Sequence, residues 1–236
     1  MTTKMIKIYL YSFFILATIL VCFSGNVMAQ TSNSGPSDTS TPPTTPPPVS
    51  GSTLAKILCF GDVIQIKSNT SSAKYLWYKL VGSDYTLIST TTSPTDSYTE
   101  QSEGSGYYRY KLVLENESGC QSPMSDEISV FVLPELTVSI DANGSNPVVC
   151  AQNQSSTILK AVTPAGYTYT YQWYREGVLI SNATSDSYEV KEANVGNVSY
   201  TVKVGYTLNT SCQKESAPVV VKVSEVPAKP VISVGL

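Results

Sequence analysis

Tyr75-Leu76-Trp77-Tyr78-Lys79 and Tyr171-Gln172-Trp173-Tyr174-Arg175 are two versions of one pattern, 96 residues apart. Successive side chains in a β-strand point to opposite faces, so each Trp would lie on one face and its Tyr neighbour on the other. No part of the flanking sequence shows the 3.6-residue apolar period of an amphipathic helix. These two segments therefore predict strands that bury a tryptophan.

Other landmarks recur around the two tryptophans in the same order, which indicates an internal repeat. Their offsets are 91, 90, 92 and 92 residues, for Cys59 and Cys150, Asp96-Ser97-Tyr98 and Asp186-Ser187-Tyr188, Tyr108 and Tyr200, and Cys120 and Cys212. A period near 92 residues is longer than that of solenoid repeats and has the size of a domain. The sequence therefore predicts tandem domains.

Each repeat reads as a series of short strands with alternating apolar residues. Turn signals rich in Gly, Ser and Asp separate them at the spacing that is typical of a β-sandwich. The predicted strands include Val63–Lys67, Ile158–Val162, Ile128–Val132, Val219–Val223, and the alternating segments around Tyr108 and Tyr200. We expect an all-β protein with two antiparallel sandwiches of about seven strands each.

At these residues the chain resembles the immunoglobulin superfold. The tryptophan of the third strand and the run Ser105-Gly106-Tyr107-Tyr108 are similar to its buried tryptophan and its tyrosine corner. Cys59-Phe60-Gly61-Asp62, the Trp-Tyr pair and Gly119-Cys120 resemble the Ig-like repeats of exported surface proteins and adhesins of Bacteroidetes-type bacteria. The resemblance implies two tandem Ig-like domains, at residues 53–134 and 135–227. It also implies that Trp77, Trp173, Tyr108 and Tyr200 are core residues.

The first 29 residues have the three parts of a secretory signal peptide. Lys4 and Lys7 precede an apolar run from Ile8 to Phe23, and Val27-Met28-Ala29 supplies small residues before a cleavage site. The apolar run is shorter than the ~20 residues that a transmembrane helix needs, which favours cleavage over a retained anchor. Lipid attachment at Cys22 is a further alternative. We expect a secreted or cell-surface protein that meets the membrane only during export.

Residues 30–52 form a segment rich in Pro, Ser and Thr, with Val49 as its only aliphatic side chain. Such a segment buries too little apolar surface to offset the entropy of ordering it. We expect a disordered linker, extended by its prolines, ahead of the first domain.

Four cysteines remain after residues 1–29 are removed, and an even number in an exported chain favours disulfides. Of the three possible pairings, we favour Cys59 with Cys120 and Cys150 with Cys212, because these pairs place one disulfide in each repeat. The start of the second strand and the end of the sixth lie at opposite ends of an Ig sandwich, which opposes this pairing because bonded Cα atoms must lie within ~7 Å. Free thiols or bonds between the domains therefore remain an alternative.

Composition excludes several classes of function. The chain has no histidine, which removes Ser-His-Asp and Cys-His nucleophile systems and histidine metal ligands. Fifteen basic and 18 acidic residues give no basic footprint for nucleic acid. We expect no enzyme, no metal and no cofactor. Tyr78 and Tyr174 could anchor a sugar or a protein, although cross-strand pairing is the more usual role.

Residues 228–236 contain Val231-Ile232-Ser233-Val234, in the place where a third repeat would begin. The sequence thus predicts further repeats beyond this tail, with an extra edge strand on the second domain as the alternative. The leading functional hypothesis is adhesion or binding of an extracellular protein or glycan. Spacer repeats, or an accessory region of a secreted hydrolase, are the alternatives.

Overall fold

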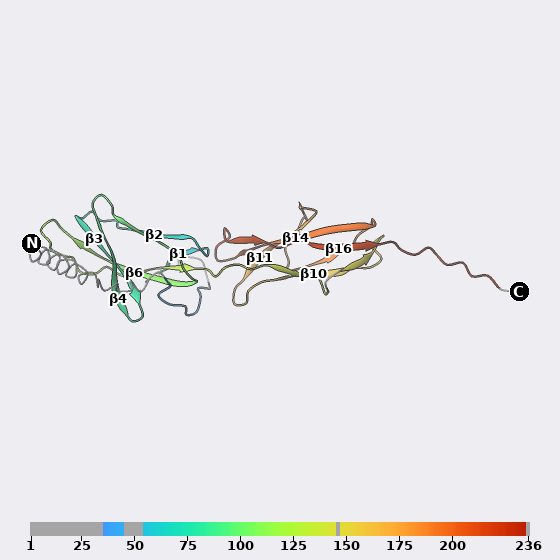
Figure 1. The fold of residues 1–236 in the computed structure, drawn as a ribbon, viewed down its shortest axis with the longest axis horizontal. Helices are drawn as coiled ribbons and strands as arrows, with labels where there is room; N and C mark the ends of the chain where they lie inside the picture. The colour runs from blue at the N-terminus through green and yellow to red at the C-terminus, as the bar shows by residue number, and fades with distance from the viewer. Residues whose placement is uncertain (1–34, 45–53, 145–146, 235–236) are drawn as a thin grey trace, which may run out of the picture. The chain divides into compact units, whose positions relative to one another are not determined.

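The computed structural model describes residues 35–44, 54–144 and 147–234, and within them every regular element is a β-strand. The strands form two β-sandwiches, here called domain 1 (β1 to β7) and domain 2 (β8 to β16) (Figure 1). Their strand order is Ig-like. In domain 1, β3, β6 and β7 lie in one sheet and β2 and β5 in the other, and in domain 2 the equivalent strands β11, β14 and β16 lie in one sheet and β10 and β13 in the other. The all-β prediction of two tandem Ig-like sandwiches is confirmed.

Domain 1 has a five-stranded sheet in the order β1-β7-β6-β3-β4 and a two-stranded sheet of β2 and β5. β1 runs parallel to β7, and the other pairs are antiparallel. The bounds are Leu54–Leu58 (β1), Val63–Lys67 (β2), Lys74–Val81 (β3), Asp84–Thr92 (β4), Ser97–Gln101 (β5), Gly106–Glu115 (β6) and Ile128–Val132 (β7).

Domain 2 has the same plan with two added strands, β8 and β15. β8 joins β10 and β13 in a three-stranded sheet, and the larger sheet has the order β12-β11-β14-β16-β9, with β15 paired to β14. The bounds are Ser139–Asp141 (β8), Val148–Cys150 (β9), Thr157–Val162 (β10), Tyr169–Arg175 (β11), Val178–Leu179 (β12), Ser187–Val190 (β13), Gly196–Tyr206 (β14), Gln213–Glu215 (β15) and Val219–Ser224 (β16).

The alternating sequence pattern produces the two cores. In β2 the buried Ile64 and Ile66 alternate with exposed neighbours, and in β14 every second residue from Val198 to Val204 is buried. Trp77 lies in the cluster of domain 1 and Trp173 in that of domain 2, where their side chains are 3% and 0% exposed. The predicted strands at 63–67 and 128–132 match β2 and β7, and that at 219–223 differs from β16 by one residue.

Part of the predicted linker contacts the edge of β6 in domain 1. β3 stops pairing with β6 at Tyr110, and Asp38 then pairs with Tyr107 on the same side of β6. The Tyr107 amide donates to the Asp38 carbonyl at 2.7 Å, and the Arg109 guanidinium lies 3.1 Å from the Asp38 carboxylate. A Cβ on Gly106 would lie 2.5 Å from that carbonyl, so the contact requires glycine. The segment expected to be a disordered linker thus contacts domain 1 at residues 36–38, because backbone pairing to a strand edge needs no apolar side chains.

Several predictions concern residues outside those that the structure describes. They are the signal peptide at 1–29 and the linker residues 30–34 and 45–52. Within the described ranges, no helix has the length and hydropathy to cross a bilayer.

Candidate functional site

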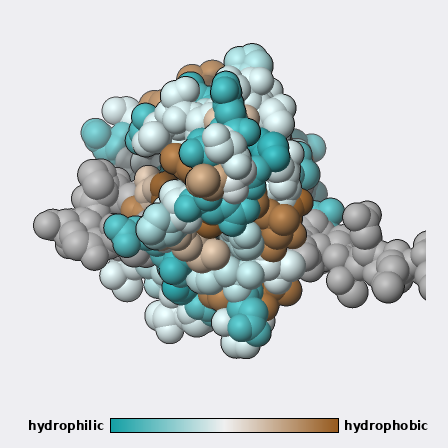
Figure 2. Space-filling model, turned by 90° about the vertical axis from the view of Figure 1, so that its left-hand side faces the viewer, coloured by the Kyte–Doolittle hydropathy of each residue, from teal (hydrophilic) through white to brown (hydrophobic). Residues whose placement is uncertain are grey.

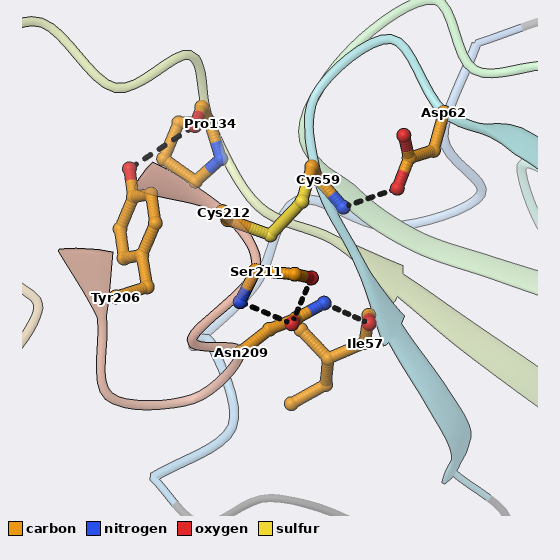
Figure 3. The surroundings of a disulfide bond; sticks show 8 residues. All are labelled: Ile57, Cys59, Asp62, Pro134, Tyr206, Asn209, Ser211 and Cys212. Atoms are coloured by element: carbon orange, nitrogen blue, oxygen red, sulfur yellow. Dashed lines mark hydrogen bonds between the residues drawn. A yellow bond between two sulfur atoms is a disulfide. The ribbon is translucent and has the colours of Figure 1, made fainter. Parts of the chain in front are cut away.

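The two domains are joined by a disulfide between Cys59, which follows β1, and Cys212, which follows β14 (Figure 3). Their Cα atoms lie 5.3 Å apart, and Cys120 and Cys150 are free. The predicted pairing of Cys59 with Cys120 and of Cys150 with Cys212 is wrong. Cys59 follows the C-terminal end of β1, which lies near the start of β6, whereas Cys120 follows the end of β6. The two cysteines therefore lie at opposite ends of the sandwich. The loop after β14 in domain 2 brings Cys212 to Cys59 instead.

Apolar side chains from both domains surround this bond. The shared cluster consists of Leu54, Ile57, Phe131, Leu133, Leu136, Tyr206, Leu208 and Cys212, all of them buried. The Asn209 amide donates to the Ile57 carbonyl at 2.9 Å, and the Tyr206 hydroxyl donates to the Pro134 carbonyl at 3.0 Å (Figure 3). The domains therefore have separate central cores that meet in a third cluster.

The landmark aromatic residues form similar series in the two domains. Trp77 stacks near Tyr98 with a centroid distance of 6.4 Å, and Trp173 near Tyr188 at 6.0 Å. No disulfide lies beside either tryptophan, in agreement with the absence of a cysteine two residues after Tyr108 and Tyr200.

The tyrosine corner is present in domain 1. The Tyr108 hydroxyl donates to the Gly104 carbonyl and accepts from the Glu103 amide, both at 3.0 Å, and its side chain is fully buried. In domain 2 the hydroxyl of the equivalent Tyr200 donates to the Glu192 carboxylate instead. The two corners therefore use different acceptors for the same tyrosine position.

Domain 1 contains a buried ionic network that we did not predict from sequence. Lys79 on β3 is 1% exposed, and its Nζ lies 2.7 Å from Oε1 of Glu100 on β5. The hydroxyls of Tyr110 and Tyr98 donate to the same carboxylate at 2.5 and 2.8 Å, and the ammonium lies 4.6 Å from the ring centroid of Tyr108. Burial lowers the pKa of Lys79, while burial and then Glu100 raise the pKa of Tyr98 and Tyr110.

Domain 2 has an equivalent network with a more open cation. Arg175 forms a bidentate pair with Glu192, with N–O distances of 2.8 and 2.9 Å. Its side chain is 46% exposed, whereas that of Glu192 is 8% exposed. Hydrogen bonds from Arg175 lower the pKa of Glu192. A sequence signal for both networks existed, because each repeat has a basic residue two positions after its Trp and a Glu eight positions before its corner Tyr.

A groove of about 290 Å³ lies between β2 and β6 of domain 1. Trp77, Tyr110, Leu112 and Leu114 line one side, and Ile66 to Thr70 the other. The segment before β7 forms its rim, where Ser122 and Ser125 accept hydrogen bonds from the backbone of β6. Polar and apolar groups thus share the lining.

The surface agrees with the composition, since Figure 2 shows a mosaic of hydrophilic and near-neutral residues with apolar residues in small patches. Tyr78 and Tyr174 are half-buried on their sheets. In the part of the chain that the structure describes, no group of three or more Cys, Asp or Glu side chains is arranged to hold a metal ion.

Comparison with known proteins gives structural similarity alone. No protein-family model and no curated protein matches the chain. Fibronectin(III)-like modules of Clostridium thermocellum CbhA align with 18% identity and a TM-score of 0.41, over 77% of this chain and 96% of that structure. An I-band fragment of titin aligns with 14% identity and a TM-score of 0.40, over 73% and 63%. The four N-terminal Ig domains of Dscam1 align with 13% identity and a TM-score of 0.33, over 74% of this chain and 44% of theirs.

Proposed function

We propose that this chain is an exported, non-catalytic Ig-like protein that acts outside the cell by adhesion or ligand binding. The observation that carries the proposal is the disulfide between Cys59 and Cys212, which is enclosed by the shared cluster. Structural disulfides form and persist in oxidising compartments outside the cytosol. Residues 1–29 would supply the export signal.

The chemistry of the surface supports an extracellular protein or glycan as the partner. The surface is weakly charged and rich in hydroxyl groups, with 16 tyrosines in the chain. Tyrosine combines a large apolar face with a hydrogen-bonding tip, which suits both sugar rings and protein surfaces. The groove beside Trp77 combines apolar side chains with serine hydroxyls and suits the same classes of ligand.

A structural role is the second candidate, and the junction between the domains favours it. A covalent bond and a shared cluster limit independent motion of the domains, as a spacer that holds another domain away from a surface would require. The two roles differ in that a spacer needs no ligand.

Localisation is tested by protease treatment of intact native cells, followed by mass spectrometry of the released peptides. We expect release of peptides from both domains, a mature N-terminus at Gln30, and Cys59 linked to Cys212. Protein recovered only from the cytosol, with both of these cysteines reduced, would contradict the proposal.

Binding is tested on arrays of glycans and extracellular matrix proteins with the purified mature chain. We expect saturable binding to at least one glycan or protein class, and the Leu112→Asp variant tests whether the groove takes part. The Val195→Asp variant is the matched control, because it adds the same charge at a residue that is 60% exposed. Absence of binding to all probes would favour the spacer.

A further inference from the structure

The disulfide pairing follows a rule that leaves two cysteines without partners. Cys59 and Cys150 occupy equivalent places at the end of β1 and β9, since Leu58 pairs with Val132 and Val149 with Val223 and each cysteine is the next residue. Cys120 follows β6 and Cys212 follows the equivalent strand β14, and the two cysteines are 92 residues apart. The observed bond joins Cys59, the cysteine at the end of β1 in domain 1, to Cys212, the cysteine after β14 in domain 2. The same rule leaves Cys150 for a following domain and Cys120 for a preceding one.

Domain 1 lacks a strand that domain 2 has. In domain 2, β8 pairs with β10, and its Ile140 packs against the core. In domain 1, β2 is the equivalent of β10 and pairs only with β5 within the described residues. The groove of about 290 Å³ lies beside β2, where Ile66 and Trp77 reach its surface. The groove therefore marks a place for one more strand.

The tail contains an apolar segment, residues 231–234, that belongs to no sheet. Val231, Ile232 and Val234 are 95%, 92% and 95% exposed. Six residues, 225–230, separate this tail from β16, and six residues, 133–138, separate β7 from β8. Ile232 is then the counterpart of Ile140, 92 residues later, in agreement with the repeat period. An exposed apolar strand with free backbone groups is a template for pairing with another chain.

We propose that copies of this chain join head to tail by repeating the internal junction. Residues 231–234 of one copy pair with β2 of domain 1 in the next copy, and Cys150 of the first copy bonds Cys120 of the second. This arrangement accounts for four features. They are the free cysteines Cys120 and Cys150, the open edge of β2 in domain 1, and the apolar residues 231–234 that belong to no sheet. Such a contact joins two different surfaces, so it can propagate along an open series of copies.

Bond formation requires an oxidant, which would be a small disulfide such as oxidised glutathione. The two thiols lose two electrons and two protons, the sulfur atoms of Cys150 and Cys120 become bonded, and the oxidant is released as two thiols. Domain 1 offers Leu114 and Asn116 where domain 2 has Tyr206 and Leu208. The junction between copies therefore has less apolar contact than the internal one, and depends more on the strand and the bond.

The test uses two complementary variants of the mature chain, Cys120→Ser and Cys150→Ser, each labelled with a different nitrogen isotope. After oxidation with glutathione, we expect each variant alone to stay monomeric and the mixture to form dimers, linked by a peptide that joins Cys150 of one isotope to Cys120 of the other. The wild-type chain should form a ladder of oligomers on a non-reducing gel. Symmetric dimers of either variant alone, or no dimer on mixing, would overturn the proposal.

The strand contribution is measured separately with Ile232→Asp. Its matched control is Val195→Asp, which places the same charge on another exposed valine. We expect Ile232→Asp to slow dimer formation at least tenfold and to abolish the additional hydrogen-exchange protection that β2 gains in the mixture beyond its pairing with β5, while the control leaves both unchanged. Equal behaviour of the two variants would show that the tail does not pair with β2 and would overturn that part of the proposal.

Discussion

Lys79 in domain 1 and Arg175 in domain 2 stand two residues after the tryptophan of the third strand, and each meets a glutamate in different surroundings. The Lys79 side chain is 1% exposed and that of Arg175 is 46% exposed, although Glu100 and Glu192 are buried to a similar degree. A buried ion pair gains little net stability but is costly to break, because the remaining charge has lost its water. Domain 1 therefore depends on its glutamate more strongly than domain 2 does, although both contain the same type of ion pair.

The largest expected effect tests whether the domains can be compared as separate units. Trp77→Ala and Trp173→Ala should each destabilise their own domain by about 3–5 kcal/mol, because each removes a large buried side chain. Hydrogen exchange read by mass spectrometry reports each domain separately, and the Trp→Phe variants are matched controls. An equal loss of protection in both domains from a single substitution would show one common core.

The second effect tests the coupling between the domains. Cys59→Ser removes a bond that lies in the shared cluster and within neither central core. We expect a loss of about 2–4 kcal/mol and the separation of one thermal transition into two. Calorimetry measures both, and Cys120→Ser is the control because that thiol is already free. A variant that still unfolds in one transition would show that the cluster alone couples the domains.

The third effect is the loss of stability when the glutamate of each ion pair is neutralised. Glu100→Gln should cost about 3 kcal/mol, because it leaves the Lys79 ammonium buried beside a neutral amide. Glu192→Gln should cost about 1 kcal/mol, because Arg175 can turn toward water. Urea denaturation followed by tryptophan fluorescence measures both losses of stability. In a Trp173→Phe background the remaining Trp77 reports domain 1, and in a Trp77→Phe background the remaining Trp173 reports domain 2. Adding Lys79→Met to Glu100→Gln should recover part of the loss, and the absence of recovery would argue against a desolvated cation as its cause.

The smallest effect is a pH dependence in domain 2. Glu192 has a pKa below its ordinary 4.5 in the folded protein, so the unfolded chain binds more protons than the folded one just below that pH. The stability that Glu192 contributes is present above pH 4.5 and is lost as the pH falls below it. We therefore expect the difference in unfolding free energy between the wild type and Glu192→Gln to shrink between pH 5 and pH 3. A constant difference across this range would exclude the ionised carboxylate as its source.

The fold could be predicted because its signals are local. The alternation of apolar and polar residues around Trp77 and in β2 is visible from neighbouring residues alone. The internal repeat then showed each landmark residue again in the second domain, which supported its assignment to a strand. The cysteine pairing could not be predicted, since it depends on which end of one sandwich meets the other. Placing Cys59 and Cys120 at opposite ends of an Ig sandwich opposed the favoured pair but did not show that Cys212 would approach Cys59.

The ionic networks and the contact between the linker and β6 were missed for different reasons. Glu100 has a regular spacing from Tyr108, but nothing local distinguishes a buried carboxylate from a solvated one. Asp38 lies in a segment whose average composition predicts disorder, yet three backbone hydrogen bonds to Tyr107 need only a free strand edge. Composition describes side chains and contains no information on such edges.

The position of the disulfide also determines how the chain would carry tension. Along the covalent chain, a pull between a residue before Cys59 and one after Cys212 passes through the sulfur–sulfur bond, which bypasses the loop that contains β2 to β14. The two cysteines are 153 residues apart in sequence, which is about 500 Å of fully extended chain. While the bond is intact, this length cannot be drawn out even if both domains unfold. The redox state of the surroundings would thus set how far a tethered copy can stretch.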